Sequence, residues 1–183
     1  MKKHIIFYTF LAVVMASCAT VQSIVKSTFP YTATLAIPAS SATSTSQSTV
    51  SMGSSFDQNF VKDGNNATKV KNVRIASARL TVNSPSGYNI GNIQSAKIYM
   101  ARANGQEEVM VASRSDIGPN IGGTLVLDID NSVALDELVR EKSVRIKMVY
   151  TLRNKTDEKA SLKISLGISA SANNGTAAAP ANN

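Results

Sequence analysis

The sequence predicts an all-β protein, an antiparallel β-sandwich of seven to eight strands with one short helix. Several segments alternate apolar and polar residues, which is the pattern of strands with one buried and one exposed face. Turn residues recur about every ten residues, as they do in β-sandwiches, and no segment keeps a helical spacing of apolar residues. The composition, 43% hydrophobic and 17% charged, is typical of a single globular domain.

The N-terminal part of this domain contains the first predicted strand, residues 29–37, in which every second residue is apolar. Pro30 marks it as an edge strand or as the start of a strand, because proline cannot donate a backbone hydrogen bond to a neighbour. The Ser/Thr-rich stretch 40–51 fits either a flexible linker or a polar edge strand that ends near Met52. Residues 54–60 are expected to form a single helical turn with two phenylalanine anchors.

The next predicted strand, residues 71–83, changes its alternation partway along. Ile75 and Ala78 are both apolar but lie three positions apart, so a regular strand would place them on opposite faces. A β-bulge near Ala76 and Ser77 would return both apolar residues to the buried face.

Two hairpins are predicted in the remainder of the domain. Asn104-Gly105 lies between the alternating runs 96–101 and 109–111, and both turn residues tolerate a positive φ. Residues 144–152 and 162–168 also alternate, with a polar turn between them. We expect these last two strands to pair as a second hairpin with one apolar face and one solvent-exposed face.

A further strand, residues 125–129, precedes the one short helix. Asn131 or Ser132 is a suitable N-cap for this helix, and acidic residues follow in its first turn. Its inner face is expected to consist of Leu135, Leu138 and Val139.

The N-terminus is basic, then apolar, and then rich in small residues up to a cysteine. Lys2 and Lys3 precede an apolar stretch, residues 5–16, that is too short to span a bilayer, which requires ~20 residues. The stretch ends at Met15-Ala16-Ser17-Cys18, which resembles a bacterial lipobox, with methionine where leucine is usual. This resemblance implies that the Cys18 sulfur carries diacylglycerol and that the signal peptide is cleaved before Cys18. Two or more acyl chains anchor a protein stably to a membrane.

These features divide the chain into four parts. We expect a signal peptide over 1–17, a lipidated tether over 18–28, the β-sandwich over 29–169 and a disordered tail over 170–183. Ala19 and Thr20 stand where an aspartate would retain many Gram-negative lipoproteins in the inner membrane. The resemblance therefore implies the outer membrane, and the lack of acidic residues over 21–26 favours its periplasmic face.

Candidate catalytic and metal-binding residues are scarce. His4 is the only histidine and Cys18 the only cysteine, and neither is available to a histidine-based triad or zinc site in the domain. The Asp128-Ile129-Asp130-Asn131 segment fits a Ca²⁺ site less well than a solvated strand end. The acidic pairs 107–108 and 157–158 point apart as strand neighbours and suit paired acid/base chemistry poorly. We therefore expect no enzymatic activity, no cofactor and no metal.

Basic residues are candidates for contact with an anionic surface. The candidates are Lys69, Lys71, Arg74, Arg79, Lys97 and Arg102. Several basic side chains fall opposite the apolar set of their strands, namely Arg74, Arg79, Lys97, Arg145, Lys147 and Lys163. Such a sheet face can meet lipid phosphates or acidic glycans, or it can simply be a charged surface that prevents aggregation. Only Tyr88 and Tyr99 are candidate exposed aromatics, which argues against a sugar-stacking platform and against binding of single-stranded nucleic acid.

The segment from Leu80 to Gly87, followed by Ser95-Ala96-Lys97-Ile98-Tyr99, resembles small β-sandwich lipoproteins of Gram-negative envelopes. The resemblance covers roughly half of the chain and implies no activity and no functional residue beyond Cys18. Three interpretations remain open. The first is a non-enzymatic sandwich that binds or scaffolds another envelope component, the second is a module whose basic face captures an anionic glycan or lipid, and the third is a hydrolase that uses carboxylates.

Overall fold

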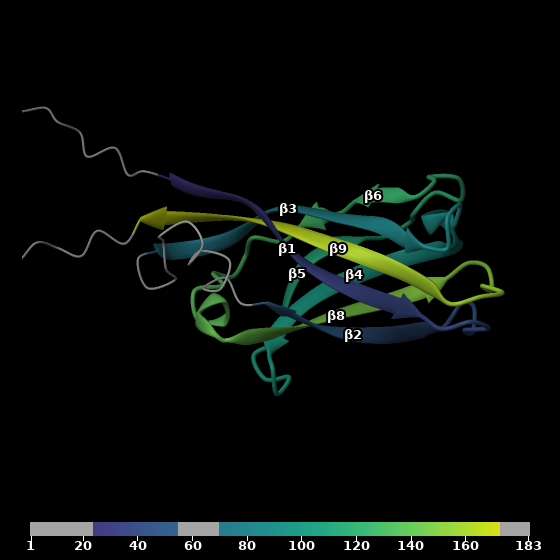
Figure 1. The fold of residues 1–183 in the computed structure, drawn as a ribbon, viewed down its shortest axis with the longest axis horizontal. Helices are drawn as coiled ribbons and strands as arrows, with labels where there is room; N and C mark the ends of the chain where they lie inside the picture. Colours follow the sequence, from purple (N-terminus) through teal and green to yellow (C-terminus); the bar gives the residue numbers. More distant parts are fainter. Residues whose placement is uncertain (1–23, 55–69, 173–183) are drawn as a thin grey trace, which may run out of the picture.

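A computed structural model describes residues 24–54 and 70–172, and it confirms the antiparallel β-sandwich, with nine strands in two stacked sheets (Figure 1). Sheet A has the order β1-β9-β3-β6. Its strands are Ile24–Ile37 (β1), Ala160–Ala172 (β9), Val70–Ser84 (β3) and Thr124–Val126 (β6). Sheet B has the order β2-β8-β4-β5-β7. Its strands are Ser46–Ser54 (β2), Ser143–Leu152 (β8), Ile93–Arg102 (β4), Val109–Arg114 (β5) and Asp128–Ile129 (β7).

Several sequence expectations lie outside the described residues. They are the signal peptide, Cys18, the first part of the tether, the helical turn after Ser54, Lys69 and the tail from residue 173. Strand β1 begins at Ile24, within the segment expected to be tether, and pairs there with the last residues of β9. The register of this pair shifts between Ser27 and Tyr31, around Pro30, and β1 is an edge strand as predicted.

The core lies between the two sheets and is made by the predicted alternation. In β8, every second residue from Val144 to Leu152 is buried, and in β9 the same holds from Ala160 to Ala170. Tyr31 of β1 is 1% exposed, and its ring lies against Gly53 of β2, where an added Cβ would come within 2.8 Å of the ring. Gly53 therefore provides the space that lets a tyrosine of one sheet pack against the edge strand of the other.

The predicted β-bulge is confirmed in β3. Its register against β9 shifts between Ile75 and Ser77, while Ile75 and Ala78 are both buried. Ala76 and Ser77 are both exposed at this point. The stretch 40–51 was compatible with a flexible linker or with a polar edge strand. It contains a strand, since β2 pairs with β8 along its whole length.

The first predicted hairpin, β4–β5, is confirmed, but its turn differs in detail. The Gly105 N–H donates to the Arg102 carbonyl over 2.8 Å, and the Arg102 N–H donates to the Gln106 carbonyl over 3.0 Å. Gly105 has a φ of 85°, whereas Asn104 is not among the residues with positive φ. The connection is therefore a three-residue loop that ends in a left-handed glycine, and not the expected two-residue turn.

The second predicted hairpin is wrong. Strands β8 and β9 follow each other in the chain but belong to opposite sheets, where β8 pairs with β2 and β4 and β9 pairs with β1 and β3. The connection over 153–159 crosses the end of the sandwich (Figure 1). This connection is long enough to cross the ~10 Å between stacked sheets. Alternating strands β8 and β9 would bury the same residues whether they paired with each other in one sheet or faced each other from two stacked sheets.

The predicted short helix is reduced to one turn of 3-10 helix, Leu138–Arg140 (η3). A second such turn, Ile90–Asn92 (η2), precedes β4, and the described residues contain no α-helix. The expected inner face is confirmed, because Leu135, Leu138 and Val139 are all buried. The predicted cap is wrong, since η3 begins after Glu137, whose side chain makes no capping hydrogen bond.

Candidate functional site

The five basic candidates within the described residues do not form one surface. Lys71, Arg74 and Arg79 lie on β3 of sheet A, whereas Lys97 and Arg102 lie on β4 of sheet B. Lys71, Arg74, Arg79 and Lys97 point outward from their sheets, but Arg102, at the end of β4, pairs with the buried Val144 and so lies on the core-facing side. Because the outward faces of two stacked sheets look in opposite directions, the structure separates the three sheet A residues from Lys97.

The outer face of sheet A is basic and lacks acidic residues. None of the four strands β1, β3, β6 and β9 contains an aspartate or a glutamate. Its outward basic residues are Lys71, Arg74, Arg79 and Lys163. Within residues 24–54 and 70–172, Lys71, Arg79 and Lys163 form no ion pair, and the Arg74 guanidinium donates to the backbone carbonyl of Asn131.

A hollow of about 470 Å³ lies on this face, over β3, β6 and β9. Its charged lining residues are Arg79 and Lys163, and its hydroxyl-bearing lining residues are Ser77, Thr81 and Ser165. Cross-strand pairing places Arg79 opposite Ser165 and Thr81 opposite Lys163, so cation and hydroxyl alternate on neighbouring strands. We call these five residues the sheet A anion cluster.

The β-bulge of β3 helps to shape the hollow. It places Ser77 opposite Gly167 of β9. A Cβ added at Gly167 would lie 2.4 Å from the Ser77 hydroxyl oxygen, so the Ser77 side chain occupies the place that a side chain at position 167 would need. The bulge and the glycine together form one wall of the hollow.

The chemistry of this cluster suits an oxyanion. Guanidinium and ammonium groups bind phosphate, sulfate and carboxylate oxygens through charge-assisted hydrogen bonds, and hydroxyl groups add neutral donors. Arg79 and Lys163 are both exposed, so a ligand reaches them without rearrangement of the core. The two cations and three hydroxyl groups on one sheet are therefore a candidate surface for an oxyanion.

Sheet B differs in part, because Lys147 on its outer face and Arg102 at the end of β4 pair with acidic side chains, whereas Lys97 and Arg145 form no ion pair within residues 24–54 and 70–172. Arg102 pairs with Glu107 over 2.9 Å and also with Glu141. The hydrogen bond that Arg102 donates to the Glu107 carboxylate is the main cause of the raised pKa of Arg102. Lys147 pairs with Glu108, and its Nζ lies 5.0 Å from the centre of the Tyr99 ring.

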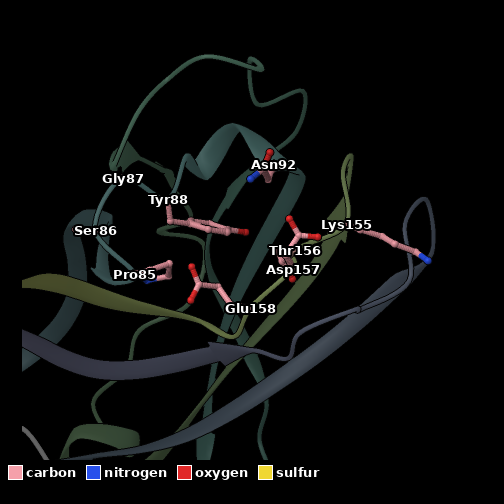
Figure 2. Close-up of a pocket in the computed structure, with 9 residues that line it drawn as sticks. All are labelled: Pro85, Ser86, Gly87, Tyr88, Asn92, Lys155, Thr156, Asp157 and Glu158. Atoms are coloured by element: carbon pink, nitrogen blue, oxygen red, sulfur yellow. The ribbon is translucent and has the colours of Figure 1, made fainter.

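A second hollow, of about 250 Å³, lies at the end of the sandwich between the β3–β4 and β8–β9 connections (Figure 2). Figure 2 shows the Tyr88 ring across this hollow, with its hydroxyl directed toward the Thr156–Asp157 segment. The Glu158 carboxylate lies near Pro85, whereas the Lys155 ammonium group points away. Burial raises the pKa of Tyr88 to about 12. The carboxylates of Asp157 and Glu158 make this hollow unfavourable for anions.

The connections around this second hollow are held by side chains that sequence reasoning did not single out. The Asn89 side chain accepts from the Gly91 and Gly122 N–H groups and donates to the Pro119 carbonyl. The Arg153 guanidinium donates to the carbonyls of Gly91 and Ile117. A Cβ at Gly91 would lie 2.1 Å from the Pro119 carbonyl oxygen, so this position requires glycine.

The Asp128–Asn131 segment has a structural role. Asp128 pairs with Arg114 over 3.1 Å, and the Asp130 carboxylate accepts from the Ser132 N–H over 2.9 Å. Hydrogen bonds from Ser132 lower the pKa of Asp130. The described residues contain no group of three or more histidine, cysteine, aspartate or glutamate side chains arranged to hold a metal ion.

No protein-family model matches the chain, and no curated protein is detectably similar to it in sequence. The described part of the chain has no helix of the length and apolarity that a membrane crossing requires. The residues of the sheet A anion cluster are thus assigned from geometry alone.

Part of this cluster was predictable from the sequence. Arg79 was among the predicted anion contacts and Lys163 was predicted to point outward, but no local pattern brought the two together or indicated Ser77, Thr81 or Ser165. The alternation in each strand predicted that Lys163 points outward. The pairing of β9 with β3, which brings Lys163 beside Arg79, depends on the whole fold.

Proposed function

We propose that this protein is a non-enzymatic envelope lipoprotein, anchored by lipid at Cys18 on the periplasmic face of the outer membrane, whose sandwich binds an anionic envelope component. The single observation that supports the binding role is the outer face of sheet A, where unpaired cations and hydroxyl groups line a hollow and the strands carry no acidic residue. This favours ligand capture by the basic face over scaffolding through an unspecified surface.

The distance from the lipid anchor favours an acidic glycan as the ligand. Lys71 pairs with Ser171 at the end of sheet A where β1 begins, close in sequence to Cys18. Lys163 is eight residues further along β9, which is roughly 26 Å at about 3.3 Å per residue. Surface charges are screened within ~8 Å at physiological salt, so an upright domain would hold the hollow beyond the field of its own membrane. Lys71 and Arg74 would remain near the head groups.

The binding role is tested with the unlipidated chain from Ala19 onward. We expect it to bind heparin or polygalacturonate in a salt-sensitive manner, and Lys163→Glu or Arg79→Glu to weaken the binding by about thirtyfold. This estimate follows because each charge near an anionic surface contributes ~1 kcal/mol and a reversal changes two charges. The measurement is titration calorimetry or affinity chromatography at low and physiological salt.

Lys97→Glu is the matched control, because Lys97 is also an exposed strand lysine without an ion pair in the described ranges, but on sheet B. If Lys97→Glu weakened the binding of the polymer equally, the effect would come from net charge alone, and the assignment of the site to sheet A would be overturned. Vesicles of phosphatidylglycerol form the second arm. Binding to these vesicles without binding to either polymer would assign the anion to a lipid head group instead.

The anchor is tested separately in the full chain. Cys18→Ala is expected to abolish incorporation of labelled palmitate and to release the protein from the membrane fraction, because the thiol is the site of diacylglycerol transfer. Ala39→Ser, an exposed change after β1, serves as a control that keeps the label. Continued labelling of the Cys18→Ala variant would show that the lipobox interpretation is wrong.

A further inference from the structure

The two sheets expose four edges, and these differ in how well they resist pairing with another chain. Strand β6 has three residues and β7 has two, which is too short for stable pairing. Strand β1 contains Pro30, carries Lys26 and has a register shift between Ser27 and Tyr31. Short strands, lysine, proline and bulges are the usual protections of an edge. Each of these three edges therefore has at least one of these protections.

Strand β2 is the exception. Its nine residues, Ser46–Ser54, pair with β8 from end to end without a register shift. They include no charged residue and no proline. On its outward face, Val50 is 43% exposed and Met52 is 51% exposed. In residues 24–54 and 70–172 no strand pairs with the other edge of β2, so its backbone groups on that side have no strand partner among the described residues.

We propose that β2 pairs antiparallel with β2 of a second copy of this chain, which joins the two copies of sheet B into one continuous sheet. A strand that pairs with itself places like residues opposite each other, so charged strands repel and an uncharged strand does not. β2 is the one long and regular edge of the described fold that meets this condition. An isologous contact of this kind forms a closed dimer.

The alternation of side chains limits the register of this pairing. Residues directly opposite each other must point to the same face, so outward residues have to meet outward residues. A twofold axis that passes midway between Val50 and Val50 of the second copy satisfies this condition. It places Val50 beside its own equivalent and Met52 beside Ser48 of the second copy, which covers the two most apolar exposed residues of the edge.

The dimer leaves the sheet A anion cluster uncovered. The twofold axis is perpendicular to sheet B, so the outer faces of sheet A in both copies point in the same direction. Two tethered copies can therefore present their basic faces to the same side. Dimer formation and anion binding are independent properties, and failure of one leaves the other intact.

The test uses the chain from Ala19 onward, which contains no cysteine. Val50→Cys places a thiol on the twofold axis, where opposite Cα atoms are ~4.5–5.5 Å apart and within the range that a disulfide spans. We expect rapid formation of a disulfide-linked dimer on mild oxidation. Val133→Cys, on a similarly exposed loop valine that is 47% exposed, is the control and should remain monomeric under the same conditions.

A second measurement follows the unmodified interface by analytical ultracentrifugation. The chain from Ala19 onward should sediment as a dimer that dissociates on dilution, and Val50→Lys should convert it to a monomer, because two lysines would then lie opposite each other. Val133→Lys should leave the dimer unchanged. A chain that stays monomeric at all concentrations, or a dimer that Val50→Lys leaves intact, overturns the proposal.

Discussion

The outer faces of the two sheets have similar numbers of basic residues and use them differently. On the outer face of sheet B, Lys147 pairs with Glu108 and lies over the Tyr99 ring, while Lys97 and Arg145 form no ion pair within the described ranges. On sheet A, Arg79 and Lys163 lie beside hydroxyl groups in a hollow. The role of a basic residue on a strand therefore depends on the neighbours that the tertiary structure brings to it.

The largest expected effect tests the orientation of sheet A. Ile164 is fully buried and Lys163, its neighbour on β9, is exposed. Ile164→Asp should cost more than about 4 kcal/mol of unfolding free energy or prevent folding, because it buries an unpaired charge. Lys163→Asp should stay within about 0.5 kcal/mol, as exposed substitutions usually do. Urea unfolding followed by circular dichroism measures both, and similar losses would show that the outer face is misassigned.

A smaller effect should separate the two faces directly. Lys147→Ala on sheet B removes the ion pair with Glu108 and the contact with the Tyr99 ring, which we expect to cost about 1 kcal/mol. Lys163→Ala on sheet A removes no such contact and should leave the unfolding free energy almost unchanged. A double-mutant cycle with Glu108→Ala isolates the ion pair. If Lys163→Ala costs as much as Lys147→Ala, the contrast between the faces is wrong.

The smallest effect on stability tests the shape of the hollow without a change of charge. Gly167→Ala brings a Cβ against the Ser77 hydroxyl, which can rotate away, so we expect a stability change within about 0.5 kcal/mol. Affinity for the acidic polymer should nevertheless fall severalfold, because part of the hollow is filled. Gly123→Ala, where the nearest side chain lies at an ordinary 3.8 Å, is the control. Unchanged affinity for the Gly167→Ala variant would mean that the ligand does not enter the hollow.

Much of the local structure could be predicted because strand alternation is a local property. The bulge near Ala76, the hairpin at Gly105 and the buried positions of β8 and β9 all follow from the order of apolar and polar residues. The prediction of a β8–β9 hairpin was wrong for the same reason, since alternation shows which face is buried but not which strand lies alongside. The structure has a single 3-10 turn where a helix was predicted. An irregular segment can bury Leu135, Leu138 and Val139 as well as a helix can, so their apolar spacing did not require a helix.

The class of fold, the residues that face the core and the expectation of a lipid anchor at Cys18 all follow from the amino-acid order alone. These depend on period-two alternation and on a short linear motif, which need no knowledge of distant contacts. The hollow shared by Arg79 and Lys163, the place of Lys97 on the opposite face and the unprotected edge of β2 follow from the way the strands assemble. Strand order is set by the non-local pairing that best buries both sheets at once, and no single segment of the chain contains that information.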